Sequence, residues 1–371
     1  MLEFFNEFRS NTIAGSGNQH IFTDDGTIRT GRIYYRISTG GAYRYAFLFS
    51  NILDSTYSDG SVSHRNMICD PYTVHGMRVG RCPASTFDPD FSEAGNSADA
   101  VTSEWQTVTF GGALRKAVAP GEFFRTDPVM LAFEKGDYLC LEITFAGTRI
   151  PYMEELIIPA YRKEGEHWIY DRRIPCPGMV GCDRPVTARI GYLGDSITEG
   201  IGPRPNSYRH WNALLSERLG EAYSYWNLGI GYARANDMAT DSAWLYKAKH
   251  NDIAFVALGT NDLSKNYPKE GIAADIERIV DILTERGITV ILITLPPFNY
   301  SEVKTERWRW VNDYLKTKVA PKVALFFDIV PILRESEERD SATPYGPHPN
   351  EEGSALWAEA LYRAINEKGL L

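Results

Sequence analysis

The first 150 residues contain short stretches in which apolar and polar side chains alternate. A period of two is typical of β-strands that bury one face. Paired turn residues separate the stretches, and no long helical pattern lies between them. The clearest alternating stretches are Tyr43–Phe49, Trp105–Phe110 and Tyr138–Phe145, and the turn pairs are Gly111-Gly112, Pro120-Gly121 and Gly136-Asp137. This part of the chain is therefore predicted to form an antiparallel β-sandwich or jelly roll.

The second half alternates apolar strand candidates with helical patterns. Five strands are predicted, at residues 186–193, 222–228, 253–258, 289–294 and 324–329. Between the third and fourth, the segment Ile272 to Arg286 has one apolar helical face, and Gly287 is a natural stop. Strands separated by covering helices predict a doubly wound parallel sheet. We expect an all-β domain over residues 1–180 and an α/β domain over residues 181–371, with the boundary between Pro175 and Pro185.

One segment of the α/β half has the composition of a catalytic turn. Gly191-Tyr-Leu-Gly-Asp-Ser-Ile-Thr-Glu-Gly200 begins at the end of the first predicted strand and places Ser196 in the following turn. An α/β fold presents nucleophiles at this edge of its sheet. The spacing is not that of a G-x-S-x-G elbow. Two other interpretations stay open: a phosphate-binding loop, although the P-loop lysine pattern is absent, and a simple helix cap by Asp195 and Ser196.

Three further blocks follow in order. Asn227-Leu-Gly-Ile-Gly231 closes the second predicted strand, Gly259-Thr-Asn-Asp262 follows the third, and Gly346-Pro-His-Pro-Asn350 lies near the carboxyl end. Together with Gly-Asp-Ser, these blocks resemble the SGNH (GDSL-type) hydrolase family over roughly residues 186 to 371. The resemblance implies a flavodoxin-like three-layer α/β/α fold with a five-stranded parallel sheet. More loosely, the segment from Val108 to Val129 resembles the β-sandwich that precedes this domain in some bacterial SGNH esterases.

By this resemblance Ser196 is the nucleophile and His348 the general base. A serine hydroxyl attacks an ester only when a neighbouring base takes its proton, and histidine titrates in the right range. Pro349 favours extended backbone at His348. Asn350 suits the cap of a following helix, so the histidine is expected on a loop that can reach a strand end. A solvent-exposed histidine on a turn is the alternative.

The oxyanion formed from an attacked ester needs fixed donors. The resemblance assigns them to the backbone N–H of Ser196, the backbone N–H of Gly231 and the side-chain amide of Asn261. Gly229 and Tyr232 are rivals of Gly231, because the block can be registered in more than one way. The alternatives are a turn that needs positive φ at the glycine, and an Asx-turn or helix cap at Asn261.

The chain departs from the family at one position. An aspartate usually stands three residues before the histidine, where it orients the imidazole. Here that position holds Tyr345, and the nearest upstream acid is Asp340. A main-chain carbonyl could instead hold the ring. We therefore predict a Ser196–His348 dyad and leave the third group open, and a degenerate, non-catalytic member is the extreme alternative.

Composition and charge narrow the function classes. The chain has 371 residues, 43% of them hydrophobic, and a formal net charge of −9, so it lacks the basic surface of a nucleic-acid or anionic-membrane binder. No apolar run is long enough to span a bilayer. The start, Met-Leu-Glu-Phe-Phe, is unlike a secretion signal, and we expect a cytoplasmic protein. Five scattered cysteines and seven histidines show no metal-ligand spacing, so neither metal nor cofactor is expected.

The leading hypothesis is a serine esterase that hydrolyses small acyl esters, acetyl groups above all, on a carbohydrate. Analogy with two-domain relatives favours this substrate. Within the same family, a lipase or thioesterase activity is an alternative. A carbohydrate-binding protein with an inactive hydrolase half is another, supported by Tyr345. A flavodoxin-like cofactor binder comes third, because it leaves Asn261 and His348 without roles.

Overall fold

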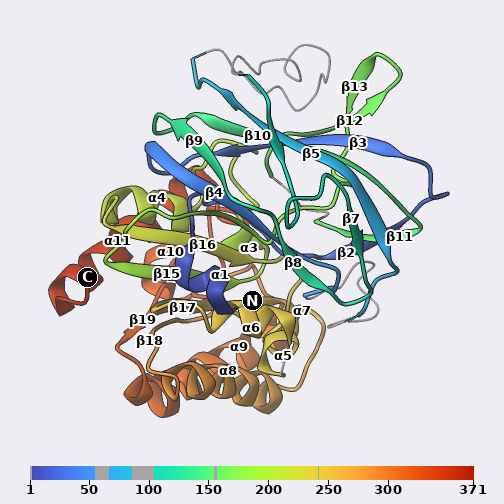
Figure 1. Ribbon diagram of the computed structural model, residues 1–371. Helices are drawn as coiled ribbons and strands as arrows, with labels where there is room; N and C mark the ends of the chain where they lie inside the picture. The colour runs from blue at the N-terminus through green and yellow to red at the C-terminus, as the bar shows by residue number, and fades with distance from the viewer. Residues whose placement is uncertain (1, 55–66, 86–103, 154–156, 241) are drawn as a thin grey trace. The chain divides into compact units, whose positions relative to one another are not determined.

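The described residues of the computed structural model are 2–54, 67–85, 104–153, 157–240 and 242–371. Those up to Pro185 form one compact unit, and those from Val186 onward form a second (Figure 1). The division falls at the carboxyl end of the segment in which the sequence places the boundary. Each unit has its own buried apolar core.

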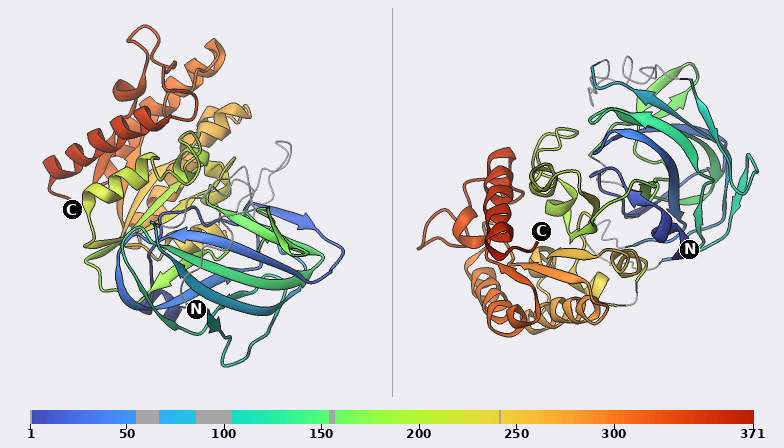
Figure 2. Two further views of the ribbon diagram at one scale, coloured as in Figure 1. Left: turned by 90° about the horizontal axis from the view of Figure 1, so that it is seen from above. Right: turned by 60° about the vertical axis from the view of Figure 1, so that its left-hand side comes forward.

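The first unit is built from antiparallel strands, as the alternating stretches predict. Its elements are α1 (Leu2–Glu7), β1 (Arg9–Ser10), β2 (His20–Thr23), β3 (Arg29–Arg36), β4 (Gly41–Ser50), β5 (Tyr72–Cys82), β6 (Gln106–Val108), β7 (Lys116–Val118), β8 (Phe123–Arg125), β9 (Val129–Phe133), β10 (Tyr138–Gly147), β11 (Arg149–Tyr152), β12 (Ala160–Glu164), β13 (His167–Tyr170) and β14 (Met179–Cys182). One sheet has the order β1-β14-β4-β8 with β9 also on β4, and the larger has the order β13-β12-β3-β10-β5-β6 with β7 also on β5. A third, two-stranded sheet pairs β11 with β2. The antiparallel pairing and the stacked sheets confirm a β-sandwich (Figures 1 and 2).

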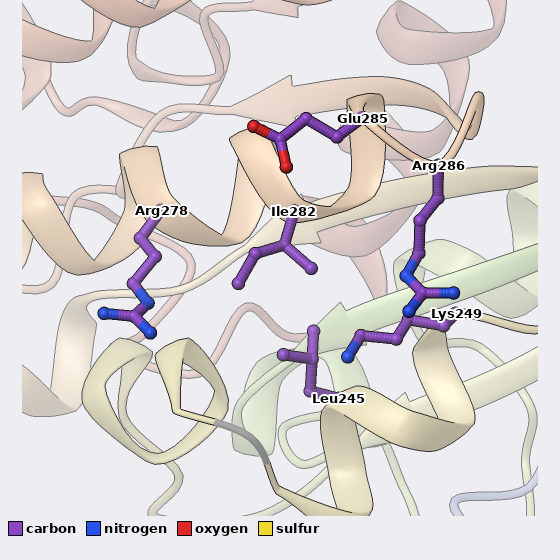
Figure 3. A pocket seen from close by; sticks show the side chains of 6 residues that line it. All are labelled: Leu245, Lys249, Arg278, Ile282, Glu285 and Arg286. Carbon is purple, nitrogen blue, oxygen red and sulfur yellow. The ribbon is translucent and has the colours of Figure 1, made fainter.

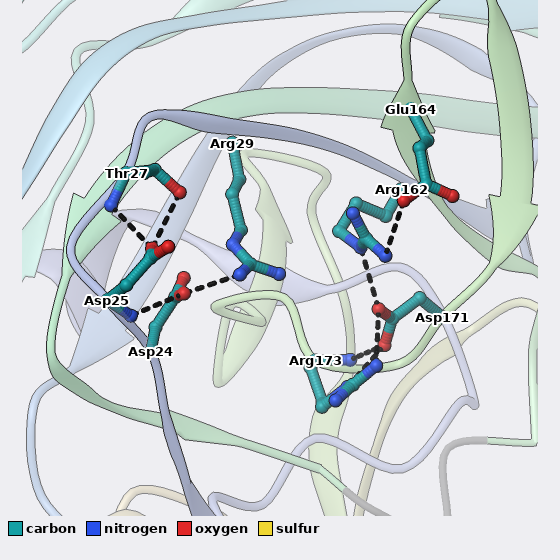
Figure 4. A network of polar contacts seen from close by, with 8 residues as sticks. All are labelled: Asp24, Asp25, Thr27, Arg29, Arg162, Glu164, Asp171 and Arg173. Carbon is teal, nitrogen blue, oxygen red and sulfur yellow. Dashed lines mark hydrogen bonds and ion pairs between the residues drawn. The ribbon is translucent and has the colours of Figure 1, made fainter.

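Charged pairs hold the loops of this unit where backbone leaves the sheets. Asp171, just after β13, accepts hydrogen bonds from the guanidinium groups of Arg162 and Arg173 (Figure 4). Beside it, Asp24 pairs with Arg29 across the turn between β2 and β3. Arg172 adds a cation–π contact with Tyr170, its cationic carbon lying 5.9 Å from the ring centroid. The contacts of Asp171 and Arg172 hold the segment that follows β13, and the Asp24–Arg29 pair holds the turn between β2 and β3.

The second unit contains a parallel sheet of five strands in the order β16-β15-β17-β18-β19. Its elements are β15 (Ala188–Gly194), α3 (Ser196–Glu199), α4 (Trp211–Leu219), β16 (Tyr223–Gly229), α5 (Ala235–Ala239), α6 (Ala243–Ala248), β17 (Ile253–Ala257), α7 (Thr260–Ser264), α8 (Lys269–Thr284), β18 (Thr289–Ile293), α9 (Glu302–Tyr314), η1 (Leu315–Val319), η2 (Ala320–Lys322), β19 (Leu325–Phe327), α10 (Val330–Leu333) and α11 (Glu351–Lys368). The five predicted strands are confirmed to within two residues at each end. The strand order is that of flavodoxin-like folds.

Helices cover both faces of this sheet and make it a three-layer domain (Figures 1 and 2). On one face α4 packs on α11, and the rings of Trp211 and Trp357 stack with centroids 5.0 Å apart. On the other face lie α8 and α9, and α8 buries the predicted apolar stripe that includes Ile276 and Ile279. Because both faces are covered, the central strands are apolar throughout rather than alternating. The sequence therefore shows them as continuous runs.

Candidate active site

The predicted site residues follow neighbouring strands of the parallel sheet. Ser196 comes directly after β15, Gly231 after β16 and Asn261 after β17. Strand β15 lies between β16 and β17, so the chain reverses its direction across the sheet at this point. Ligands of doubly wound folds bind outside the carboxyl ends of the strands at such a switch point. Parallel pairing brings these three loops to one edge, as the sequence predicts.

Ser196 begins the four-residue helix α3. The side chain of Asp195 caps this helix by accepting a hydrogen bond from the N–H of Ile197 at 3.0 Å. Two glycines let α3 lie against the sheet: a Cβ on Gly194 would fall 2.0 Å from the Thr198 hydroxyl oxygen, and one on Gly229 would fall 2.2 Å from the Glu199 nitrogen. Helix α3 therefore packs against both β15 and β16.

His348 lies in the loop between α10 and α11. Asn350 caps α11, its side chain accepting from the N–H of Gly353 at 2.9 Å, which confirms the predicted cap. The loop after β18 holds the other end of the histidine loop, since the Asn299 side chain accepts from the N–H of Thr343 at 3.0 Å. The Phe298 ring meets the imidazole edge to face, with centroids 5.7 Å apart.

These two loops bring the serine and the histidine together. Ser196 Oγ lies 2.8 Å from His348 Nε2, although the two residues are 152 positions apart in the sequence. Ser196 is 7% exposed and His348 is half-buried. With its proton on Nδ1, the imidazole accepts the serine O–H at Nε2. This is the arrangement in which a histidine can remove the proton of an attacking hydroxyl.

Burial lowers the pKa of His348 below its ordinary value of 6.5. A base with a lowered pKa keeps its neutral form to lower pH. We therefore expect the acid limb of a kcat/KM profile to have its midpoint below pH 6.5, because that limb reports the essential base of the free enzyme. Hydrolysis of a neutral ester measured from pH 4 to 8 checks this. A midpoint above 6.5 would contradict it and indicate an acidic group acting on the ring.

Asp340, the acid that the sequence offers as a possible orienting group, is not hydrogen-bonded to the His348 ring. In the described part of the chain, no carboxylate is hydrogen-bonded to the His348 ring. Asp340 instead forms two hydrogen bonds with the Arg309 guanidinium on α9, at 2.7 and 3.0 Å. The Tyr345 carbonyl accepts from the N–H of Asn350 at 2.9 Å. Both groups hold the loop around the histidine.

Replacing Asp340 with asparagine is therefore expected to change kcat/KM by less than about threefold. The ion pair that it breaks is half exposed, and exposed pairs contribute about 0–1 kcal/mol. Kinetics and a thermal melt of Asp340→Asn beside the wild type test this. A loss of tenfold or more with an unchanged melting temperature would return Asp340 to the role of orienting acid.

The predicted oxyanion donors differ in what they contact. The Asn261 side-chain amide donates one hydrogen bond to the Ala233 carbonyl at 3.0 Å, which leaves its second hydrogen for another acceptor. The Gly231 N–H donates to the Glu199 carboxylate at 2.6 Å. This contact differs from the expected role of Gly231, because an amide committed to a buried carboxylate is not aimed at a substrate.

Tyr232, the rival of Gly231 in the sequence, is the next residue of the same turn. Its φ of 61° lies in the left-handed region that favours glycine, and its side chain is 42% exposed. The loops after β15, β16, β17 and β18 each contain such non-glycine residues. In the described part of the chain they are Asn206, Tyr208, Tyr232, Asn266 and Asn299. Strained backbone of this kind gathers at functional sites.

Two acids at the site had no role in the sequence interpretation. Glu199 and Asp262 are both 0% exposed. Glu199 accepts a hydrogen bond from Gly231 in the turn after β16, and Asp262 accepts one from Ala235, the first residue of α5. Burial raises the pKa of Asp262 to about 7. The signal that was present is an acidic residue near the end of each of two short motifs, Gly191–Gly200 and Gly259–Asp262.

A second hollow of this unit contains none of the predicted site residues. A hollow between α6 and α8 is lined by Leu245, Lys249, Arg278, Ile282, Glu285 and Arg286 (Figure 3). Among the described residues, no His, Cys, Asp and Glu side chains cluster in a way that could hold a metal ion. No helix of that part of the chain has the length and apolar character to cross a membrane.

Comparison with known proteins assigns the second unit to a family. The model of the GDSL-like Lipase/Acylhydrolase family matches residues 192–356. Residues 192–356 form a GDSL-like lipase/acylhydrolase domain. The match includes both Ser196 and His348 of this domain.

Individual relatives of the GDSL-like domain are distant. An acetylxylan esterase from Xylanibacter ruminicola is 23% identical over 266 residues, which are 59% of this chain and 49% of the relative. The chain thus spans about half the length of that relative. A putative lipolytic protein of the G-D-S-L family from Desulfitobacterium hafniense has a TM-score of 0.39 at 22% identity. The match covers 47% of this chain and 98% of that protein. A family two carbohydrate esterase from Cellvibrio japonicus has a TM-score of 0.38 at 12% identity. The match covers 97% of this chain and 96% of that protein.

Proposed function

We propose that this chain is a serine esterase that removes small acyl groups, acetyl above all, from a carbohydrate. The observation that carries the proposal is the 2.8 Å contact between Ser196 Oγ and His348 Nε2. A serine that only caps a helix has no need of a histidine from a loop 152 residues away. The family of the domain, which is one of ester-bond hydrolases by its description, supports the same chemistry.

In the first half of the proposed reaction, His348 Nε2 takes the Ser196 proton while Oγ bonds to the ester carbonyl carbon. The carbonyl π electrons move to oxygen and form an oxyanion. When the carbonyl re-forms, the bond to the alcohol breaks, and the imidazolium donates its proton to the departing alkoxide. Water then attacks the acyl-enzyme with the same histidine as base, and Ser196 recovers its proton as the acid leaves.

The oxyanion would be held by three donors. Ser196 is the first residue of a helix, so its N–H has no acceptor within that helix. Asn261 contributes the second hydrogen of its amide, and the turn after β16 contributes a backbone N–H. Since Gly231 donates to Glu199, we assign the turn's donor to Tyr232. Loss of one such donor typically costs about 100- to 1,000-fold in kcat.

The carbohydrate acetyl substrate rests on one relative. The Xylanibacter ruminicola protein is named an acetylxylan esterase, and its similarity covers 59% of this chain. A lipase or thioesterase is the second candidate, and the name of the family favours the lipase. Hydrolysis rates for p-nitrophenyl esters of two to twelve carbons, beside acetylated xylan and the acyl-CoA series, separate the candidates. A fall in rate with acyl length favours the acetylesterase.

The test of the proposal is labelling by a fluorophosphonate probe, followed by mapping of the modified peptide. An activated serine forms a covalent phosphonate, whereas a binding protein without catalysis has no need of one. We expect one adduct, at Ser196. Absence of labelling, together with no hydrolysis of any ester in the series, would rule out the esterase in favour of a carbohydrate-binding protein.

A further inference from the structure

The turn between β16 and α5 is held by two buried carboxylates. Glu199 Oε2 accepts the N–H of Gly231 at 2.6 Å, and Asp262 Oδ2 accepts the N–H of Ala235 at 3.0 Å. Both acids are 0% exposed. The turn thus has one end fixed by each acid, and Tyr232 lies between the two fixed points.

Each acid belongs to an element that carries a catalytic group. Glu199 stands in α3, which begins with Ser196, and Asp262 directly follows Asn261 in α7. The Asn261 amide adds a bond to Ala233 in the same turn at 3.0 Å. Movement of the turn would therefore displace it from both the nucleophile and the amide. The contacts tie three loops from three strands into one body.

Buried carboxylates are a costly way to hold a turn. Removing an ionised carboxylate from water is unfavourable unless strong hydrogen bonds compensate. The raised pKa of Asp262, about 7 because of burial, shows this cost for one of the two acids. Apolar residues of similar volume often give greater stability than buried charges do. What a carboxylate adds is a short, directional bond to a backbone amide.

We propose that Glu199 and Asp262 are positioning residues that fix the Gly231–Ala235 turn and its oxyanion donor relative to Ser196 and Asn261. The inference rests on the esterase function proposed above. Catalytic donors must be held to about 0.5 Å, and a misplacement of 1 Å can cost about 100-fold in rate. Neither acid touches the substrate. Their effect is on the geometry of the turn.

The test distinguishes loss of the oxygen that accepts the Gly231 N–H from a general loss of folded protein. Glu199→Met fills the space but cannot accept the Gly231 N–H, whereas Glu199→Gln keeps an oxygen at the same reach. We expect kcat for p-nitrophenyl acetate to fall about 10- to 100-fold in Glu199→Met, with KM changed less than about threefold, and kcat to stay within about threefold of wild type in Glu199→Gln. Rates are divided by the concentration of sites that the fluorophosphonate labels at completion.

Thr198→Val is the matched control. Thr198 is a buried neighbour in the same helix, and its hydroxyl has no hydrogen-bond partner within the described residues. Its loss is expected to leave kcat unchanged. Should Glu199→Met not fold, Glu199→Asp withdraws the carboxylate by one methylene and is expected to lower kcat about tenfold.

The outcomes distinguish the inference from the proposed function. An inactive, unlabelled wild type overturns the esterase itself. An active wild type with a Glu199→Met variant of full kcat per labelled site overturns the positioning role. So does an equal loss of kcat in Glu199→Met and Glu199→Gln, because the acceptor oxygen would then not be what matters.

Discussion

Replacing Ser196 with alanine is expected to lower kcat/KM for p-nitrophenyl acetate by at least about 10⁴-fold. Ser196 Oγ is the atom that would bond to the carbonyl carbon, and it is the partner of His348 Nε2 at 2.8 Å. The oxyanion donors and the substrate contacts remain in the variant, so a small residual rate over water is expected. The fold should be unaffected, because in the described part of the chain the Ser196 hydroxyl bonds only His348 Nε2 and holds no backbone group.

Ser242→Ala provides the control for this measurement. Ser242 is also a buried serine of the GDSL-like domain, but its hydroxyl caps α6 by accepting from the N–H of Leu245 at 3.0 Å. Its loss should cost about 1 kcal/mol of stability and leave kcat/KM unchanged. If Ser196→Ala retained a tenth of the wild-type rate, after subtraction of spontaneous hydrolysis, the nucleophile would have to be another residue.

Loss of the histidine is expected to be almost as severe. His348→Ala removes the only base within hydrogen-bonding distance of Ser196 Oγ in the described part of the chain, and should lower kcat by about 10³- to 10⁵-fold. A hydroxyl without a base is a poor nucleophile at neutral pH. The Ser196→Ala/His348→Ala double variant should be no slower than Ser196→Ala alone, because the two residues act as one unit.

Steady-state rates of the two single variants and the double variant check this, with added imidazole as a second measurement. Imidazole can enter the space left by His348 and restore part of the activity to His348→Ala, but not to the double variant. Losses that multiply in the double variant would mean that serine and histidine act independently. Their contact would then be structural.

The sheet of the second unit was predictable because the pattern that identifies each strand and helix lies within one short stretch of sequence. Strands buried on both faces appear as apolar runs, and helices such as α8 show a single apolar stripe that ends near Gly287. Parallel pairing then places the residues after β15, β16 and β17 at one edge. The pairing order of the first unit was not predictable, since it depends on contacts between strands far apart in the sequence, such as β3 with β10.

Details of the site depended on side-chain partners that no local pattern reveals. The pairing of Asp340 with Arg309 joins a loop to a helix 31 residues away. Which amide of the turn faces the site depends on backbone angles, and a tyrosine at φ 61° is not signalled by its residue type. The contact of Gly231 with Glu199 could not be predicted either, because the two residues are 32 positions apart in the sequence. The four motifs identified the loops, and the partner of each group came from the structure.

The left-handed residues in the loops after four strands bear on any attempt to make this protein withstand heat. A non-glycine residue in that conformation costs roughly 1–2 kcal/mol, less for asparagine. Glycine at Tyr232, whose side chain is 42% exposed, would release this strain, so this position is an attractive target for stabilisation. At Tyr208, which is 4% exposed, the loss of buried packing would outweigh the strain released. Yet Tyr232 lies in the turn that we assign to oxyanion binding, where greater freedom would loosen the donor. Thermal stability and catalytic rate are therefore opposed at this turn. A heat-tolerant variant is better sought in the loops of the β-sandwich.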